Sequence, residues 1–583
     1  MNLQEQHDRD VARICEQVKE FHNDQKHFRI YHGSSGSTRP IAFQVGSYID
    51  TSMLNRTFPV DKTKKTIKVE PKIHYDELVA ATLKEGYMPL IVPELKALTV
   101  GGGFSGTAGE SSSYLYGMFE QIVTEIEIVL GDGSLTTASK TFQPDLLEWA
   151  GSSMGTMGIV TLLEVQLTEA KKYVQLDIQR VQGLKGCISA METAIANPSV
   201  GYIDGIMFDK SFGVVMSGRP VDDNVSKLEI RSFHTRNDPW FTNYIDSVAK
   251  NKKIDPIPSI LIPITDYFFR YDRGVFWGGK LAFDYFHMPF NRLTRWTLDA
   301  FMGSRVCYHA LHEGGFASKY IVQDFTMPRS SVEAFVEYVS NTMPCAYEFF
   351  VCPIRSGNDL RITNKIIPPG GDKSKADLIA NERLYNVGIY GKGMSDQDAF
   401  VKLNRQLEHK LWYDFSGLKM LYARSYYTPE EFLAIYNREP YDVVRAKYHA
   451  EGLPNVYDKI SADMNHGRKP PGRFPGLIGA GRAFLGLVSQ KRRTGYLIDH
   501  KANPGSEETT KTARKEAEKG FEERNPGKKV INGYAVTDGT NGHTKPAVST
   551  NEEKMADLNG SAPSAEHAGT TAAQPVVNGE AKE

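Results

Sequence analysis

The chain has 583 residues, more than one hydrophobic core usually supports, so at least two domains are expected. Its composition, 40% hydrophobic and 24% charged, is ordinary for a globular protein, and its net charge of −1 argues against nucleic acid as a partner. No apolar run approaches the roughly 20 residues that a membrane-spanning helix needs, so no spanning helix is expected.

The N-terminal segment, residues 1–27, is predicted to form an amphipathic helix. Val11, Ile14, Cys15 and Val18 fall on one face at helical spacing, and the rest of the segment is strongly charged. A signal peptide needs an apolar core, which this charged segment lacks.

Residues 28–175 alternate between short strand-like segments and turns rich in glycine and serine. The predicted elements are strands at Phe28–Tyr31, Thr66–Glu70, Gln121–Leu130 and Gly158–Leu167, and a helix at Tyr75–Glu85. Gly-Asp-Gly follows Leu130 and is a strong hairpin signal.

Three glycine-rich stretches in this region allow the backbone to approach a ligand closely. They are His32–Arg39 (HGSSGSTR), Thr99–Ser113 (TVGGGFSGTAGESSS) and Gly155–Val160 (GTMGIV), which enters a strand. Consecutive N–H groups and serine hydroxyls in the first can bind a diphosphate, although such a stretch alone is more often a simple turn. The second is interpreted as a loop; it lacks the GK[ST] ending of a Walker loop and is not a well-placed GxGxxG.

The remainder of the chain divides by composition. Residues 176–465 mix strands and helices and are dense in aromatic residues, as in a large domain core or the lining of an apolar cavity. Residues 466–500 form a basic, amphipathic segment, and residues 501–583 are poor in large apolar residues and predicted to be disordered. The five cysteines form no CxxC pair and no Cys/His cluster, so no metal site is expected.

The order and spacing of these motifs resemble the FAD-binding domain of the vanillyl-alcohol-oxidase/PCMH flavoprotein family. Within it, the chain is most similar to the delta-24-sterol reductases, including the Diminuto-type enzymes. The segments that carry this similarity are PELKALTVGGG, GESSSYLYGMFEQI, LGDGSL, SMGTMGIV, RGVFWGG, IVQDFTMP, FFVCPIR, GLKMLYARSYYTPEEF and NVYDKI, which lie within residues 28–460.

The resemblance implies an α+β fold: a two-subdomain FAD-binding domain at 28–175 and an α+β substrate domain at 176–465. It also implies a set of FAD-binding residues: Gly33, Ser34, Ser35, Gly36, Ser37, Thr38, Thr99, Gly101, Gly102, Gly103, Gly106, Thr107, Gly109, Ser112, Ser113, Gly155, Gly158 and Ile159. Covalent members of the family have a histidine in the first loop. Aligning the loops puts Gly36 at that position, so FAD is expected to be bound non-covalently.

The resemblance further implies reduction of the side-chain C24=C25 double bond of a sterol or related isoprenoid, with NADPH as electron donor. Such an alkene needs a proton and a hydride, and reduced flavin supplies the hydride. Arg424 and Tyr422 align with a lysine and an aromatic residue beside the flavin in related aldonolactone oxidases, and Glu94 is a candidate proton donor. For Arg424 a surface ion pair, and for Tyr422 a core position, remain open.

Two alternatives remain. One is an FAD-linked oxidase or dehydrogenase of an alcohol, aldonolactone or secondary metabolite, although the histidine-tryptophan pair typical of those enzymes is missing at positions 421–422. The other is a non-catalytic flavin-binding protein. The related reductases begin with a membrane-spanning segment that is not found in this sequence, so we expect a cytoplasmic location. Peripheral attachment to the endoplasmic reticulum membrane through the basic segment 468–493 is an alternative to its packing on the protein body.

Overall fold

The structure is a computed structural model. It describes residues 2–33, 37–39, 43–314, 320–343, 348–355, 373–436 and 438–461, with short pieces at 481, 498–499, 528–531 and 534–537. The chain divides into a first unit, residues 1–502, and a second unit, residues 503–583. Among the described residues, no helix is both long enough and apolar enough to cross a membrane.

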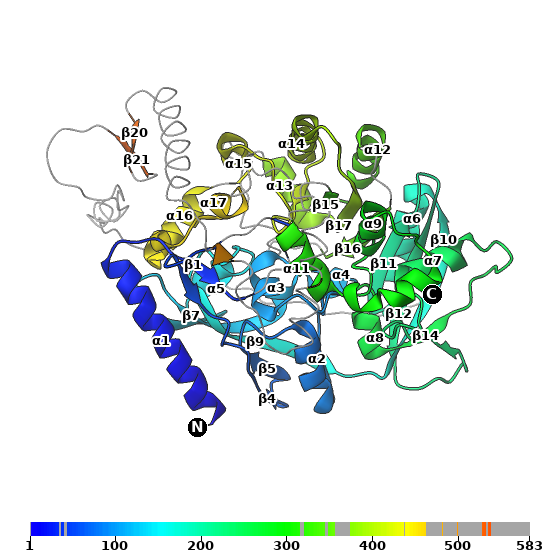
Figure 1. Cartoon of the computed structure of the whole chain (residues 1–583), viewed down its shortest axis with the longest axis horizontal. Helices are drawn as coiled ribbons and strands as arrows, with labels where there is room; N and C mark the ends of the chain where they lie inside the picture. Colours follow the sequence, from blue (N-terminus) through cyan, green and yellow to red (C-terminus); the bar gives the residue numbers. More distant parts are fainter. Residues whose placement is uncertain are drawn as a thin grey trace, which may run out of the picture. The chain divides into compact units, whose positions relative to one another are not determined.

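The N-terminal helix α1 (Leu3–Asn23) confirms the prediction of an amphipathic helix. The side chain of Asn2 caps it by accepting a hydrogen bond from the Glu5 N–H at 2.9 Å. Val11, Ile14 and Val18 are buried, whereas Cys15 is half-buried. The helix packs along β3 (Tyr48–Asp50) and β7 (Val123–Val129), at the edge of the region that contains the first sheet (Figure 1).

A buried polar network joins α1 to that region. The His7 ring lies 2.8 Å from a Glu70 carboxylate oxygen and 3.0 Å from one of Glu127. Burial alone would lower the pKa of His7, but the two carboxylates outweigh it and raise the pKa to about 9. Arg56 also pairs with Glu70 and with Asp10 of α1. At neutral pH, ion pairs between buried side chains of opposite charge therefore connect α1 to this region.

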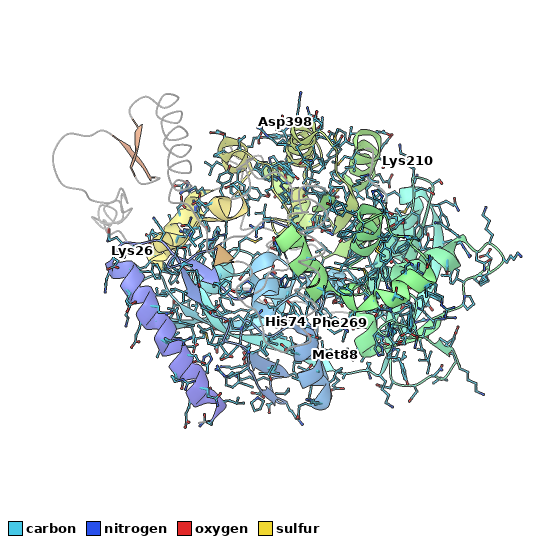
Figure 2. The ribbon with its side chains drawn as sticks, viewed as in Figure 1. Lys26, His74, Met88, Lys210, Phe269 and Asp398 are labelled. Carbon is cyan, nitrogen blue, oxygen red and sulfur yellow. The ribbon has the colours of Figure 1, made fainter. Side chains whose placement is uncertain are left out.

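The first sheet is antiparallel, and its described strands follow the order β4-β5-β9-β7-β8, with β6 paired to β9. The strand bounds are β4 Thr57–Asp61, β5 Thr66–Val69, β6 Tyr87–Pro89, β7 Val123–Val129, β8 Leu135–Ser139 and β9 Ile159–Glu169. The predicted hairpin at Gly-Asp-Gly is confirmed by the antiparallel pairing of β7 with β8, and Gly133 in its turn has a φ of 81°. The predicted helix at 75–85 is α2 (Tyr75–Lys84), flanked by His74 and Met88, which Figure 2 labels.

Smaller elements complete this half of the fold. β1 (Arg29–Tyr31) pairs in parallel with β3, and β2 (Phe43–Gln44) pairs in parallel with β19 (Ile498–Asp499). The remaining described helices before residue 173 are α3 (Val100–Gly106), α4 (Ser113–Tyr116), the 3-10 helix η1 (Phe119–Ile122) and α5 (Pro144–Ala150).

The second sheet contains nine described strands in the order β13-β14-β10-β12-β11-β16-β17-β15-β18. Their bounds are β10 Tyr173–Gln182, β11 Tyr202–Met207, β12 Phe212–Val221, β13 Glu229–Ile230, β14 Ile260–Pro263, β15 Tyr320–Pro328, β16 Phe349–Ile354, β17 Leu384–Lys392 and β18 Leu418–Lys419. The two sheets with their helices confirm the α+β class.

Helices cover one face of the second sheet. α6 (Gly183–Ile195), α12 (Val332–Thr342) and α14 (Gln397–Tyr413) form a hydrophobic core with it (Figure 1). Because side chains alternate along a strand, Phe349 and Val351 of β16 join that core, while Phe350, Cys352 and Ile354 face the other way. Further α-helices between residues 241 and 381 are α7 Phe241–Lys250, α8 Ile264–Phe268, α9 Gly278–Tyr285, α10 Arg292–Thr297, α11 Ser304–Gly314 and α13 Lys373–Asn381.

The last helices of the first unit return to the first half of the fold. α15 (Pro429–Ile435), α16 (Arg438–Lys447) and α17 (Val456–Ile460) follow β18, and α16 packs on α5 (Figure 1). Tyr448 donates a hydrogen bond to Asp145 at 2.8 Å, and Arg445 donates to the carbonyl of Thr156. In the second unit, β20 (Lys528–Ile531) and β21 (Tyr534–Thr537) pair as an antiparallel hairpin within the segment predicted to be disordered, most of which lies outside the described residues.

Candidate active site

A cavity of about 510 Å³ is lined by residues of both halves of the first unit. The lining from the first half of the unit includes the glycines and small polar residues of 37–38, 99–113 and 155–158. The lining from the second half is largely apolar and aromatic, and includes Val275, Phe276, Leu281, Tyr285, Phe286, Phe301, Met302, Leu311, Phe350, Cys352, Ile354, Tyr390 and Met420. This combination suits a large ligand with a polar part and an apolar partner molecule.

The glycine-rich stretch at 99–113 is not the loop that the sequence suggested. Residues 100–106 form helix α3, and the hydroxyl of Thr99 caps it by accepting from the Gly102 N–H at 3.1 Å. Packing explains two of its glycines: a Cβ on Gly101 would lie 2.5 Å from Cβ of Pro71, and one on Gly103 would overlap the Tyr75 hydroxyl. The cap and this close packing outweigh the poor helix propensity of glycine.

Gly106 lines the cavity for a different reason. A Cβ built there meets no protein atom within 4 Å, so packing does not require glycine at this position. A ligand lying against the backbone would require it.

Several buried polar atoms on the cavity wall have no hydrogen-bond partner among the described residues. They are Nδ1 of His32, Oγ1 of Thr38, Oε1 of Glu94 and Oγ1 of Thr107. Buried polar atoms are rarely left unsatisfied in folded proteins, so such a cluster is a sign of a ligand site. Hydroxyls beside open glycine backbone fit a cofactor with phosphate, ribose and heterocycle groups.

Glu94 is the most perturbed acid on the wall. It is 6% exposed, and burial raises its pKa to about 8. Arg270 pulls the pKa down, but this arginine is itself engaged in a fully buried ion pair with Asp204 at 2.6 Å. The Glu94 carboxyl is therefore mostly protonated at pH 7.

Tyr422 and Asp324 form a second polar group on the wall. The Tyr422 hydroxyl donates to Asp324, and the Asn386 amide donates to the other oxygen of that carboxyl at 2.9 Å. Burial raises the pKa of Asp324 and holds that of Tyr422 well above its ordinary value. Asp324 comes from β15 and Asn386 from β17, so the second sheet positions this group.

The comparisons with known proteins agree with this geometry. A family described as "FAD binding domain" matches residues 7–139. The Delta(24)-sterol reductase of Homo sapiens is 27% identical over 471 residues, covering 79% of this chain and 87% of the human protein. The Delta(24)-sterol reductase of Arabidopsis thaliana is 26% identical over 444 residues, covering 70% of this chain and 76% of the plant protein.

Residues 7–139 therefore match an FAD-binding domain, and most of the chain is similar to the Delta(24)-sterol reductases. The chain is an FAD-dependent oxidoreductase. A D-lactate dehydrogenase of Anaerostipes hadrus is also similar, with 28% identity over 151 residues that cover 25% of this chain and 32% of the dehydrogenase. The similarity to the sterol reductases therefore extends over far more of the flavoprotein than the similarity to the dehydrogenase.

Most of the residues that the resemblance suggested for this flavoprotein lie together. The cavity is lined by Ser37, Thr38, Glu94, Thr99, Gly101, Gly102, Gly103, Gly106, Thr107, Gly109, Ser113, Gly155, Gly158, Ile159 and Tyr422. Gly33 and Ser112 are not on its wall, and the Ser112 hydroxyl instead donates to the carbonyl of Leu90 at 2.9 Å. Ser34, Ser35 and Gly36 lie outside the described residues.

Arg424 also lies off the cavity wall. Its guanidinium carbon is 5.2 Å from the ring centre of Tyr426, and its carbonyl accepts from Gln323 at 3.1 Å. A position of Arg424 beside the flavin stays a prediction from the sequence.

Sequence reasoning missed Asp324 and Lys459, both of which line the cavity. Asp324 could have been noticed as a lone acid in the apolar strand Ile321–Met327. The sequence around Lys459 gives no such signal, because Lys459 reaches the cavity only through the packing of α17 against the N-terminal half of the unit.

Proposed function

We propose that this flavoprotein reduces the side-chain C24=C25 double bond of a sterol or related isoprenoid, with NADPH as electron donor. The observation that carries the proposal is the buried Glu94, whose pKa is raised to about 8, in the lining of a cavity that also contains many apolar and aromatic side chains. Reduction of an unactivated alkene requires a proton donor and a hydride donor that are both held close to the double bond. A cavity that excludes water favours both transfers. The Delta(24)-sterol reductase names of the relatives support the same substrate class.

The reaction adds one proton and one hydride across the double bond. Bound FAD, once reduced by NADPH, would supply the hydride. We assign the proton to the Glu94 carboxyl, which would protonate one alkene carbon and leave the tertiary carbon to accept the hydride. Glu94 would then recover its proton from solvent before the next turnover.

The apolar wall supports an alkene over a polyol. Phe350, Cys352 and Ile354 of β16 all face the cavity, and Phe276 and Met420 extend the same surface. A sugar alcohol or aldonolactone would leave its hydroxyl groups without partners along these side chains. The alternative of an alcohol- or lactone-oxidising enzyme is therefore less well supported by the cavity.

We propose that FAD is held non-covalently by the glycine and hydroxyl groups of the polar wall. Thr38 and Thr107 offer unsatisfied hydroxyls, and Gly106 offers open backbone. Ser37 donates to the carbonyl of Tyr422 at 2.8 Å, which joins the first loop to the substrate side of the cavity. The covalent-histidine position falls at Gly36 by alignment.

A cytoplasmic location, and peripheral attachment to the endoplasmic reticulum membrane through 468–493, stay predictions from the sequence. That segment lies almost wholly outside the described residues.

Anaerobic reduction of the purified yellow protein tests the proposal. NADPH should bleach the flavin absorbance, and a C24=C25 sterol should then restore it. Bleaching by sugar alcohols or aldonolactones, without bleaching by NADPH, would favour the oxidase alternative. Bleaching by neither would favour a non-catalytic flavin-binding protein.

A further inference from the structure

Arg270 and Asp204 form an ion pair that is buried next to the cavity lining. Arg270 follows α8 and the residue Phe269, which Figure 2 labels, and Asp204 belongs to β11. A guanidinium nitrogen lies 2.6 Å from a carboxylate oxygen, and both side chains are 1% exposed. Removing two charges from water costs about as much free energy as their attraction returns, so such a pair adds little net stability. Its effect on neighbouring charged groups is then the more important property.

The contacts of Arg270 hold its positive charge at Asp204. The guanidinium donates to the Tyr267 carbonyl at 2.8 Å, and its carbon lies 4.0 Å from the ring centre of Tyr267 and 4.7 Å from that of Tyr271. The Tyr271 hydroxyl donates to the same Asp204 oxygen at 3.1 Å. One carboxylate therefore compensates the arginine among aromatic side chains.

Two acids of the cavity lining, Glu94 and Glu110, lie near this pair. Arg270 donates to the Ser111 hydroxyl at 3.3 Å, and that hydroxyl donates to one carboxylate oxygen of Glu110 at 2.7 Å. The Ser112 hydroxyl contacts the other Glu110 oxygen. Oε1 of Glu94, in contrast, is buried and has no hydrogen-bond partner among the described residues. Glu94 is therefore the acid that is left to act on a substrate.

The charge on Glu94 is set by opposing influences. Burial is the main cause that raises its pKa to about 8; the charge of Arg270 lowers the pKa, and the charges of Glu110 and Asp204 raise it. Further groups near Glu94 are neutral at pH 7, because burial above all holds their pKa values well above the ordinary range: the Tyr271 and Tyr390 hydroxyls and the Cys352 thiol. Among the described residues, Arg270 is thus the cation that favours ionised Glu94, and Asp204 opposes it.

We propose that Asp204 is a positioning residue for the alkene reduction: by pairing with Arg270, it prevents that positive charge from ionising Glu94, so the proton donor stays protonated. The inference rests on the proposed sterol reduction and on Glu94 as its proton donor. Without a carboxylate at position 204, the unpaired guanidinium would attract the nearest acids and favour the ionised form of Glu94. An ionised Glu94 has no proton to donate to the alkene.

Asp204→Asn should therefore shift the titration of the donor to lower pH. If the pKa of Glu94 falls from about 8 to about 6, its protonated fraction at pH 7 falls from about 90% to about 9%. Reoxidation of the reduced flavin by the sterol should then be about tenfold slower at pH 7 and should recover at pH 5, where about 90% of the acid is protonated again.

Arg270→Met provides the opposite perturbation. It removes the cation and keeps Asp204, so the donor should titrate at higher pH and reoxidation at pH 9 should be faster than in the unchanged protein. The double variant Asp204→Asn/Arg270→Met removes both charges and should return close to the original pH profile. Loss of packing alone would instead leave the double variant at least as impaired as either single variant.

The test is stopped-flow reoxidation of the NADPH-reduced full-length protein by a C24=C25 sterol, measured from pH 5 to pH 9. Glu408→Gln is the matched control, because Glu408 forms an equally buried ion pair with Lys419, and neither residue contributes to the pKa of Glu94. This control should leave the pH at which the donor titrates unchanged.

The outcomes separate the inference from the function on which it rests. If Asp204→Asn keeps the original pH profile, or loses rate equally at all pH values without recovery in the double variant, the inference is wrong and Glu94 remains the donor. The same conclusion follows if Arg270→Met shifts the titration downward. If the unchanged protein shows no acid that titrates near pH 8, or if Glu94→Gln reoxidises at the original rate, the assignment of the donor is itself wrong.

Discussion

Replacing Glu94 by glutamine removes the proposed proton while preserving the shape of the side chain. The pKa of Glu94 is raised from an ordinary value of 4.5 to about 8, so the folded site as a whole disfavours the charged form by about 5 kcal/mol. The acid is about 90% protonated at pH 7 and about 9% protonated at pH 9. Alkene reduction should therefore be about tenfold slower at pH 9 than at pH 7 in the unchanged protein.

Stopped-flow measurement of the two half-reactions isolates this effect. In Glu94→Gln, reduction of the flavin by NADPH should proceed at the original rate, because it needs no proton from this side chain. Reoxidation by the sterol should be slower by about 10²- to 10⁴-fold, the usual contribution of a general acid, and should lose its dependence on the acid of pKa 8. Tyr422→Phe is the comparison, since its hydroxyl already donates to Asp324. If Glu94→Gln reoxidises at nearly the original rate and Tyr422→Phe does not, Glu94 is not the donor.

Three further predictions concern the cofactor and the N-terminal helix. Acid precipitation should release the flavin into the supernatant, and colour retained in the pellet would contradict non-covalent binding. Gly106→Val should fold but purify with little flavin, and full flavin content in this variant would show that the Gly106 backbone does not contact FAD. Gly103→Val should instead lower the melting temperature, because the valine side chain would overlap the Tyr75 hydroxyl. The raised pKa of His7 stabilises the fold fully below pH 6.5, and this stabilisation of about 3 kcal/mol should be lost as pH rises through 9. Denaturant unfolding should show that loss in the unchanged protein and not in His7→Gln, and equal pH slopes would refute it.

Sequence patterns predicted the elements whose formation depends mainly on neighbouring residues. The helix at 75–84 follows from its apolar spacing, and the hairpin after Leu130 follows from Gly-Asp-Gly. Helix α3 was missed because the Thr99 cap and the packing of Gly103 on Tyr75 are tertiary effects that outweigh the low helix propensity of glycine.

The candidate site was only partly predictable for a related reason. The glycines and hydroxyls of the polar wall lie in short motifs, and most of them line the cavity. The pairing of Asp324 with Tyr422 joins residues 98 positions apart, and the carbonyl of Lys459 accepts from Arg39, 420 positions away. These residues are brought together by the order of the strands in the second sheet and by the packing of α17 against the N-terminal half of the unit. Neither can be predicted from a single sequence motif.

The return of α16 and α17 to the Gly155–Gly158 turn also bears on how the protein matures. During synthesis, the polar wall around α3 emerges from the ribosome more than 300 residues before Lys459. Arg445 then fixes the turn by donating to the Thr156 carbonyl and, at 2.6 Å and 2.8 Å, to the carbonyls of Ala450 and Leu453. A nascent chain that has not yet reached α17 lacks Lys459 and the Arg445 contact to the turn, so we expect FAD to bind only after both halves of the first unit have been synthesised. A fragment that ends at the flavin domain should accordingly emerge colourless.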